Sequence, residues 1–233
     1  MRLDKFICKS TELTKVTALQ YIHEGIIKVN GEIILDAATQ VHENNHVTLN
    51  GNRLTARDFR YILMHKPAKT ICSNIDEAYP SLFNYVDVEK VSELHIAGRL
   101  DADTTGLVLI TDDGRWSFNI TRPTQKCQKV YRVQLSRELL SNTQAKFEQG
   151  LQLQGEKQLT LPAKLDIIHA KEVLLTITEG RFHQVKRMFA AVGNRVVSLH
   201  RERIGDVCLD VDVGQWRHLT PEEVRSFNHT LSS

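Results

Sequence analysis

The stretch from Gly98 to Gly114, GRLDADTTGLVLITDDG, decides between three possible folds for this chain. Four of its residues are aspartates: Asp101, Asp103, Asp112 and Asp113. Their spacing begins like a calcium loop between two helices. It also begins like the D-x-D-x-T motif that follows a buried parallel strand in metal-dependent phosphohydrolases. In a third interpretation one aspartate acts without metal, as a nucleophile or a base.

The residues around the aspartates argue against both metal sites. A calcium loop requires an oxygen ligand at its ninth position and a bidentate glutamate at its twelfth, and these positions hold Leu109 and Asp112. The sequence GLVLIT inside the same loop predicts a strand. The phosphohydrolase strand runs straight into its aspartate, whereas Gly98-Arg99 interrupts ELHIAGRL before Asp101. We therefore expect no metal site and favour the single aspartate.

The segment EGRFHQVKRM, residues 179–188, offers the cation that an ionised aspartate needs. A positive charge within about 4–6 Å favours the charged form of a carboxyl group. Helical spacing places three basic side chains on one face of this segment: His183, Lys186 and Arg187. The opposite face carries an apolar core stripe: Val185, Met188, Phe189 and Val192. A solvated helix face has the same pattern, so this cluster alone does not decide the chemistry.

Basic residues gather in two segments although the net charge of the chain is only +2. Residues 115–137 hold six Lys or Arg and no acidic residue, and residues 181–203 hold six against the single acid Glu202. Tyr131 lies in the first segment, between Lys129 and Arg132 on a predicted strand. An aromatic side chain among basic ones is typical of base stacking beside phosphate contacts, although a half-buried strand tyrosine is more common. The two segments together indicate an anionic partner.

Composition places the chain among ordinary globular proteins. Of its 233 residues, 41% are hydrophobic and 25% are charged. No apolar run approaches the ~20 residues that span a bilayer, and the N-terminus is charged from the start. The four cysteines are far apart and form no C-x-x-C pair, which indicates reduced thiols rather than a zinc site. We expect a cytoplasmic protein without a membrane partner.

Residues 1–58 predict a small α+β module. The spacing of Val16, Leu19 and Ile22 predicts a helix that stops at Gly25. The sequence IIKVNGEII predicts a hairpin that turns at Asn30-Gly31, and Asn50-Gly51 repeats the signal. The charged segment 52–60 offers a hinge to the following domain.

The remaining chain predicts many strands and few helices, which favours an α+β fold over a doubly wound parallel sheet. The strands are expected in RYILMH, GLVLIT, KVYRVQL, AKLDII, EVLLTIT and RVVSLH. One helix is expected over residues 141–149 with Ser141 as its cap, another over 185–192, and a third from the capping box at Thr220. Asp112-Asp113-Gly114 predicts a plain turn that closes a strand. We expect Asp103, Thr104 and Thr105 to brace the loop around Asp101.

Three segments together resemble the type A family of RNA pseudouridine synthases that modify the small ribosomal subunit. GRLDADTTGLVLITDDG is similar to the signature of that family, KVYRV to its tyrosine motif, and EGRFHQVKRMFAAVG with LHRERIG to its third motif. RLDKFI and GIIKVNG resemble the S4 RNA-binding module that precedes the catalytic domain. The resemblance covers nearly the whole chain. It implies an S4 domain over residues 1–58 and a catalytic domain over 59–233, with a mixed, mainly antiparallel sheet.

The resemblance also implies a role for individual residues. Asp101 matches the catalytic aspartate of the family, and Lys186 matches the basic residue that pairs with it. Arg99 matches the arginine that helps to hold the target nucleotide out of its helix. Tyr131 matches the tyrosine against the target base, and Leu199 matches the apolar residue of the site.

Basic side chains of both domains are further expected to contact the RNA. These are Arg2, Lys5, Lys15, Lys28, Arg122, Lys126, Lys129, His183 and Arg187. The family often has Ser-Arg near the start of the second helix of the S4 module, where this chain has Thr14-Lys15. The charge is kept, but bidentate recognition of a phosphate by arginine is lost.

The implied reaction converts one uridine of 16S rRNA to pseudouridine. The N1–C1′ bond breaks, the uracil turns and C5 joins C1′, with no cofactor. Asp101 would either attack C1′ or remove the C2′ proton, and the sequence leaves both open. The implied partner is 16S rRNA, either free or in an assembly intermediate of the small ribosomal particle, and we expect a monomer. The rival interpretation is a non-catalytic rRNA-binding or assembly protein that uses the S4 module alone and can dispense with Asp101.

Overall fold

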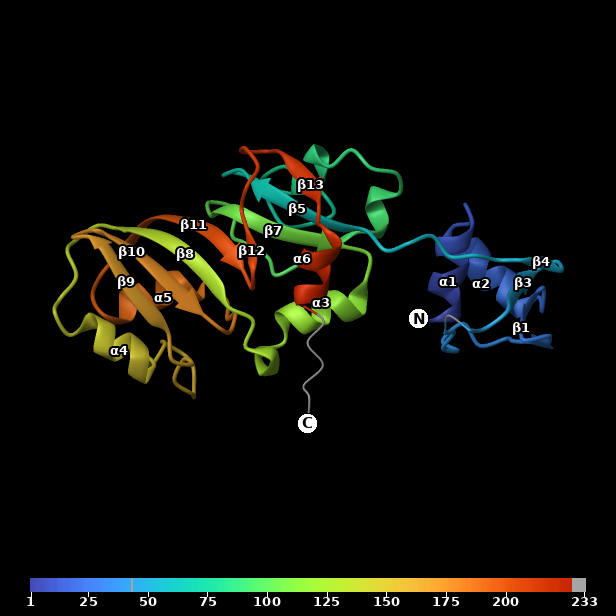
Figure 1. Cartoon of the computed structure of the whole chain (residues 1–233), viewed down its shortest axis with the longest axis horizontal. Coiled ribbons are helices and arrows are strands. Elements are labelled where there is room, and N and C mark those ends of the chain that lie inside the picture. Colours follow the sequence, from blue (N-terminus) through green and yellow to red (C-terminus); the bar gives the residue numbers. More distant parts are fainter. Residues whose placement is uncertain (43, 228–233) are drawn as a thin grey trace. The chain divides into compact units, whose positions relative to one another are not determined.

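The computed structural model describes residues 1–42 and 44–227, which fold into two compact units (Figure 1). The first unit is Met1–Asp58 and the second is Phe59–Ser233, of which the last six residues lie outside the described ones. No helix within the described ranges is long and apolar enough to cross a membrane.

The first unit packs two helices on a small antiparallel sheet of strand order β2–β1–β3–β4. Its elements are α1 (Leu3–Ser10), α2 (Lys15–His23), β1 (Ile27–Val29), β2 (Glu32–Ile33), β3 (Val47–Leu49) and β4 (Asn52–Arg53). Asn30 and Gly31 both have positive φ, as the tight hairpin between β1 and β2 requires, so the predicted hairpin is confirmed. The predicted helix is α2, but Ala18 and Ile22 form its buried face while Val16 lies in solvent.

The second unit is built on one mixed sheet. Its strands are β5 (Tyr61–Lys66), β6 (His95–Ala97), β7 (Thr105–Thr111), β8 (Lys129–Leu135), β9 (Lys164–His169), β10 (Glu172–Ile177), β11 (Val196–Ile204), β12 (Val207–Cys208) and β13 (Trp216–His218). Its helices are α3 (Gly114–Thr121), α4 (Thr143–Gln149), α5 (Gln184–Ala191) and α6 (Pro221–Ser226), with 3₁₀ turns η1 (Leu82–Tyr85), η2 (Val91–Glu93) and η3 (Pro123–Gln125). The six predicted strands are thus confirmed within a few residues, and the α+β class is confirmed.

A parallel pair of strands lies in the middle of this mainly antiparallel sheet. The strand order is β13–β5–β7–β11–β8–β10–β9, with β6 on β7 and β12 on β11. Only β7 and β11 run parallel among the described pairs, and they meet at Thr105–His200 and Gly106–Arg201. A Cβ on Gly106 would lie 2.3 Å from the carbonyl oxygen of Arg201, so only glycine permits this close approach. The start of β7, next to the aspartate loop, is thereby fixed against β11.

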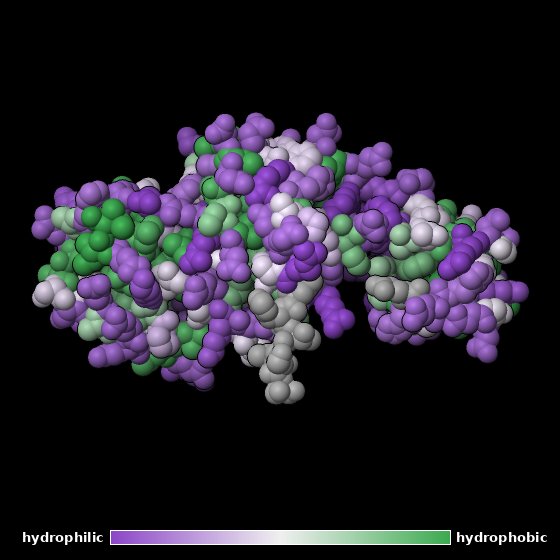
Figure 2. Space-filling view, in the orientation of Figure 1, coloured by the Kyte–Doolittle hydropathy of each residue, from purple (hydrophilic) through white to green (hydrophobic). Residues whose placement is uncertain are grey.

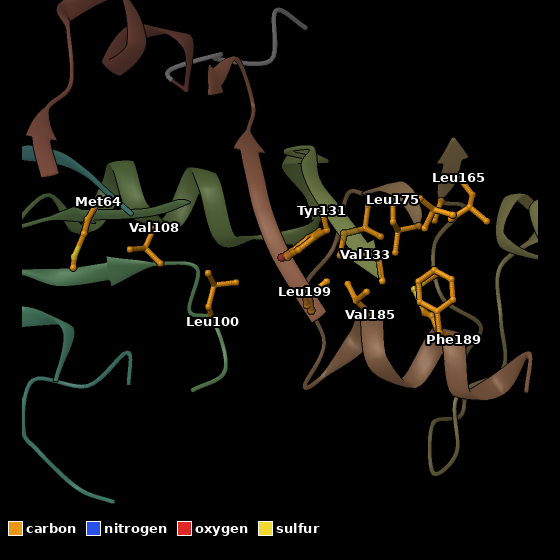
Figure 3. Packing of buried hydrophobic residues seen from close by; sticks show 14 of the residues in the cluster. Met64, Leu100, Val108, Tyr131, Val133, Leu165, Leu175, Val185, Phe189 and Leu199 are labelled. Atoms are coloured by element: carbon orange, nitrogen blue, oxygen red, sulfur yellow. The ribbon is translucent and has the colours of Figure 1, made fainter. Parts of the chain in front are cut away.

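The two faces of the sheet carry separate hydrophobic cores, because side chains alternate along each strand. Val108 and Ile110 of β7 belong to the core that includes Val185 and Phe189 of α5 (Figure 3). Leu107 and Leu109 belong to the core on the other face, which includes Trp116 of α3. Helices α3 and α5 therefore cover opposite faces of the sheet.

The edge strand β9 exposes apolar side chains. Ile167 is 52% exposed and Ile168 is 40% exposed, and Figure 2 shows apolar residues gathered around this end of the sheet among mostly hydrophilic ones. Charged Lys164 and Asp166, which pair with each other at 2.8 Å, lie on the same edge strand. Charges on an edge strand oppose pairing with another sheet.

The structure corrects two predictions about element ends. Asp113 does not lie in a plain turn but caps helix α3, because its carboxylate accepts hydrogen bonds from the backbone of Arg115 and Trp116. That helix is missing from the predicted elements, because its apolar residues are few and a turn signal precedes it. Ser141 does not cap α4, which begins at Thr143 after Asn142 and has no side-chain cap.

Replacement of Asp113 by alanine is expected to destabilise the second unit. Besides capping α3, its carboxylate accepts a hydrogen bond of 2.9 Å from the Tyr61 hydroxyl. We expect a loss of about 1–2 kcal/mol in the free energy of unfolding, measured by chemical denaturation. Asp87→Ala is the matched control, because Asp87 is exposed and caps no helix. Equal stability of the two variants would contradict the capping role.

Candidate active site

Asp101 lies in the loop that joins β6 to β7. The buried side chain of Lys66 contacts the main chain of this loop. The ammonium group of Lys66 donates to the carbonyl oxygens of Ala102 and Thr104 at 3.2 and 2.9 Å, and to that of Pro67 at 3.1 Å. Burial lowers the pKa of Lys66, while the three carbonyl oxygens surround its ammonium group. The backbone N–H of Thr104 donates to the Asp101 carbonyl at 3.1 Å, which closes a tight turn. The main chain of the loop is therefore fixed by the Lys66 side chain and by its own turn.

A buried arginine on β11 joins the start of the same loop to Tyr131. Arg201 is only 1% exposed. Its guanidinium donates to the carbonyl oxygens of Leu107 and Gly98, both at 2.7 Å, and to the Tyr131 hydroxyl at 3.3 Å. The guanidinium carbon also lies 5.8 Å from the centre of the Tyr131 ring. Arg201 thus fixes the tyrosine and the Gly98 turn relative to each other.

Basic side chains of α5 and of the residue before it lie against the Asp101 carboxylate. The Lys186 ammonium lies 2.9 Å from Oδ2 of Asp101 and 2.6 Å from Oδ1 of Asp103. The other oxygen of Asp101 lies 3.4 Å from Nε2 of His183. Asp101 and Lys186 are 85 positions apart in the chain, and both are partly buried. The predicted pairing of a cation with this aspartate is therefore present in the geometry.

Helix α5 presents these side chains because its other face is fixed in the core. Val185, Met188 and Phe189 are buried, which confirms the predicted core stripe. His183 precedes the helix with φ of +48°, a left-handed conformation that costs a non-glycine residue of the order of 1 kcal/mol or more. This backbone turn places the His183 ring beside Asp101.

Tyr131 and Leu199 lie on adjacent strands of the same core, near Leu100 (Figure 3). Both side chains are at least nine-tenths buried. The guanidinium of Arg99, in contrast, is exposed and makes no hydrogen bond or ion pair with the residues that the structure describes. The described loop, β8, β11 and α5 thus bring together a carboxylate, an ammonium group, an aromatic ring and an apolar side chain.

Comparison with known proteins identifies the family. A model of the family described as RNA pseudouridylate synthase matches residues 60–191, and a model of the S4 domain matches residues 1–47. The chain belongs to the RNA pseudouridylate synthase family. It is an RNA pseudouridine synthase with an S4 domain, so the predicted family and enzyme class are confirmed.

Relatives of this synthase match it over almost their whole length. Proteins named ribosomal small subunit pseudouridine synthase A are 46% identical in Vibrio cholerae and 47% identical in Escherichia coli K12, each over 97% of this chain and 99% of the relative. A solved crystal structure of a pseudouridylate synthase is 44% identical over 97% of this chain and 99% of its own, with a TM-score of 0.72.

The structure places the expected RNA-contacting side chains of the synthase in different surroundings. Lys5, Lys15, Lys28 and Lys126 are exposed, and Arg2 pairs with Asp4 at 2.9 Å. Arg122 lies over the ring of Phe118 at 5.3 Å. The predicted RNA contact of Lys129 is wrong, because its ammonium is buried and donates to the carbonyl oxygens of Cys127 and Ile120. RNA contact by the others stays a prediction.

Several residues of this site carry no signal that sequence analysis could use. Lys66 and Arg201 look like ordinary surface cations in the sequence, but both are fully enclosed. Each of the two side chains donates to three acceptors. These contacts join residues up to 103 positions apart, so local spacing in the sequence does not reveal them. Within residues 1–42 and 44–227, no group of three or more His, Cys, Asp or Glu is arranged to hold a metal ion. That the reaction needs no metal stays a prediction.

Asp103 departs from its expected role as a brace of the loop. Its side-chain carboxylate reaches the Lys186 ammonium. The buried Thr104 hydroxyl has no hydrogen-bond partner in the described part of the chain, so it does not brace the loop either. Thr105 does fasten the loop end, because its hydroxyl lies 2.7 Å from Nδ1 of His200 on β11.

The Asp103→Asn variant is expected to lower the pKa of Lys186. The hydrogen bond from Lys186 holds the pKa of Asp103 below its usual value. Partial burial opposes the charge of Lys186, but the hydrogen bonds to Asp103 and Asp101 outweigh it and raise its pKa. The Lys186–Asp103 pair therefore forms above the depressed pKa of Asp103 and is lost again as pH rises through the raised pKa of Lys186. Without the Asp103 charge, Lys186 should lose its proton at lower pH.

The measurement is the pH dependence of reductive methylation at Lys186, followed by mass spectrometry. The titration of Lys186 should move to lower pH in Asp103→Asn, and Asp206→Asn is the control because Asp206 is exposed and remote in sequence. We also expect the rate of pseudouridine formation to fall by about tenfold, which corresponds to the free energy of one charge-assisted hydrogen bond. An unchanged Lys186 titration would refute the shared contact.

Proposed function

We propose that this chain isomerises one uridine of small-subunit ribosomal RNA, the 16S rRNA, to pseudouridine. The observation that carries the proposal is the Asp101–Lys186 pair at 2.9 Å in a loop fixed by Lys66. Relatives that carry the small ribosomal subunit in their names, at 46–49% identity, support this substrate. In this proposal residues 1–58 bind RNA and residues 59–233 carry out the reaction, in the cytoplasm where ribosomes are assembled.

Asp101 is the proposed catalytic carboxylate. Lys186 holds one of its oxygens and favours the ionised form, because a nearby opposite charge stabilises a carboxylate. The other oxygen then attacks C1′ of the target uridine or takes its C2′ proton. Either route breaks the N1–C1′ bond, after which the uracil turns and C5 bonds to C1′. In the first route this last step breaks the bond between Asp101 and C1′, and in the second Asp101 returns its proton to C2′. The C5 proton leaves and N1 gains one, so no redox change takes place.

Tyr131, Leu199 and Arg99 are the proposed contacts of the target nucleotide. The uridine must leave its stack, which costs a few kcal/mol. The exposed Arg99 is proposed to occupy the vacated space, since it has no partner in the described chain. Tyr131, held by Arg201, is proposed to lie against the extruded base, above Leu199. Basic side chains that hold the phosphates offset part of the cost.

RNA that carries tritium at C5 of uridine tests the proposal, because bond formation at C5 releases the label. The purified protein should release tritium from small-subunit rRNA, either deproteinised or in an assembly intermediate, and not from large-subunit rRNA. A comparison of the two small-subunit substrates also decides which one is preferred. Release from large-subunit rRNA alone, or from neither RNA, would contradict the proposed substrate.

The expected monomer is part of the proposal and has its own measurement. Sedimentation at the concentrations of the tritium assay should give one species of about 26.6 kDa, the mass of the chain. A stable dimer would contradict this part of the proposal.

A further inference from the structure

Phe182 is a large apolar side chain that the fold leaves in solvent beside Asp101. It is 76% exposed, whereas Phe83, Phe147, Phe189 and Phe227 lie in a core. Its ring stacks on the ring of His183, with 3.8 Å between the centroids and 22° between the planes. His183 in turn lies 3.4 Å from the Asp101 carboxylate. A chain of two rings therefore leads from the proposed catalytic carboxylate to the surface.

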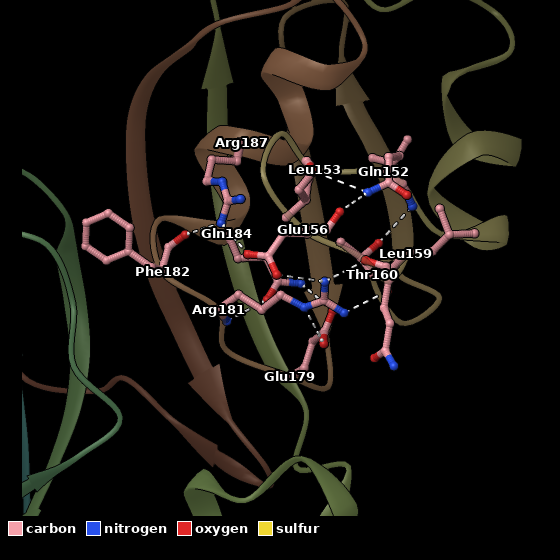
Figure 4. Close-up of polar contacts among 12 residues, drawn as sticks. Gln152, Leu153, Glu156, Leu159, Thr160, Glu179, Arg181, Phe182, Gln184 and Arg187 are labelled. Atoms are coloured by element: carbon pink, nitrogen blue, oxygen red, sulfur yellow. Dashed lines mark hydrogen bonds and ion pairs between the residues drawn. The ribbon is translucent and has the colours of Figure 1, made fainter.

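The segment that carries Phe182 is held rigidly. The Phe182 carbonyl accepts a hydrogen bond of 3.1 Å from Arg187. Arg181 pairs with Glu179 at 3.1 Å and donates to the backbone of residues 158 and 159. Figure 4 shows these contacts on one side of the segment and the Phe182 ring pointing away from them. An exposed ring on a fixed backbone loses little conformational freedom when a ligand binds.

The Phe182 ring stacks on one aromatic partner among the described residues. This partner is His183, which covers one face of the ring. A single exposed ring beside basic residues suits a nucleobase, because every base has a flat face that stacks on an aromatic side chain. An apolar protein partner would instead require a contiguous patch, whereas the residues on either side of Phe182 in the chain, Arg181 and His183, are basic.

We propose that Phe182, backed by His183, is a stacking site for an RNA base that neighbours the target uridine. This inference rests on the proposed function. The target base itself is assigned to Tyr131, whose ring is buried in the core of the sheet. The solvent-exposed Phe182 ring lies beyond His183, outside that position. A nucleotide next to the extruded uridine reaches Phe182 while the uridine faces Asp101.

The first test is the affinity of Phe182 variants for deproteinised small-subunit rRNA. Phe182→Ala should raise the dissociation constant by about tenfold, as expected for the loss of one stacked base. Phe182→Trp should bind at least as well as the natural protein, because it keeps a flat ring. The matched control is Leu140→Ala, since Leu140 is also an exposed apolar side chain, at 65%, but lies between β8 and α4 and is not among the expected RNA contacts. Equal losses in the two alanine variants would overturn the proposal.

The second test removes the base instead of the ring. A fragment of small-subunit rRNA is prepared with an abasic nucleotide on either side of the target uridine, one at a time. At one of the two positions, Phe182→Ala should cost no further affinity, whereas on intact RNA it costs about tenfold. If the loss persists on both abasic fragments, the stacking site is refuted. Pseudouridine formation by the natural protein on the intact fragment tests the proposed function separately, because it does not depend on whether Phe182 stacks on a base.

Discussion

Asp101→Asn is expected to abolish pseudouridine formation. The substitution keeps the size of the side chain but removes the negative charge that pairs with Lys186 and that is proposed to act on the substrate. An amide is neither a nucleophile nor a base of useful strength, so we expect a loss on the order of 10⁴-fold or more in the single-turnover rate. The measurement is pseudouridine content of small-subunit rRNA after nuclease digestion and chromatography.

The same variant should fold and bind RNA. The Asp101 side chain is about one quarter exposed, and Lys186 keeps its contact with Asp103 when Asp101 is neutral. The free energy of unfolding should therefore change by less than about 1 kcal/mol, as is usual for a partly exposed ion pair. Substantial activity of a folded Asp101→Asn protein would contradict the assignment of Asp101 as the catalytic carboxylate. Loss of folding would be visible in the same denaturation curve.

Arg201→Met is expected to have the largest effect on stability. The Arg201 side chain is buried, and its guanidinium donates hydrogen bonds to two carbonyl oxygens and to the Tyr131 hydroxyl. Methionine fills similar space but leaves these acceptors without a donor. We expect a loss of about 3–5 kcal/mol in the free energy of unfolding, because buried polar groups lose their partners. Chemical denaturation at neutral pH measures it.

Two comparisons distinguish this effect from a general loss of charge. Arg203→Met is the control, because Arg203 lies on the same strand but makes only a 3.5 Å contact with Gln128. Arg201→Lys should recover little, because a lysine cannot reach three acceptors in the planar arrangement of a guanidinium. It should also remain poorly active, since Tyr131 and the Gly98 turn lose their common support. Similar stability of Arg201→Met and Arg203→Met would contradict this account.

Local patterns predicted the elements whose periodicity is strong. KVYRVQL was expected as a strand and forms β8 over the same residues, because its alternating apolar side chains, Tyr131, Val133 and Leu135, pack in one core. The helix expected over 185–192 forms over Gln184–Ala191, because its apolar stripe packs in the core. Helix α3 escaped prediction, because only Trp116 and Ile120 of its large apolar residues are buried and the preceding Asp-Asp-Gly resembles a turn.

The candidate site was predictable only in part. The family motifs single out Asp101 and Lys186, and the structure places the two side chains in contact. Lys66 and Arg201 were missed, since their importance comes from burial and from carbonyl oxygens supplied by distant segments. Phe182 was missed as well, because a phenylalanine next to a core helix is expected inside the protein and this one is exposed. In each case the tertiary fold, and not the local sequence, decides the surroundings.

The Asp101 site is proposed to isomerise one uridine of small-subunit rRNA. The most direct test maps pseudouridine at nucleotide resolution in unmodified small-subunit rRNA, or in its assembly intermediate, after incubation with the natural protein and with Asp101→Asn. One new pseudouridine, close to one per molecule, is expected with the natural protein and none with the variant. No new pseudouridine with the natural protein, or the same site modified by both proteins, would contradict it.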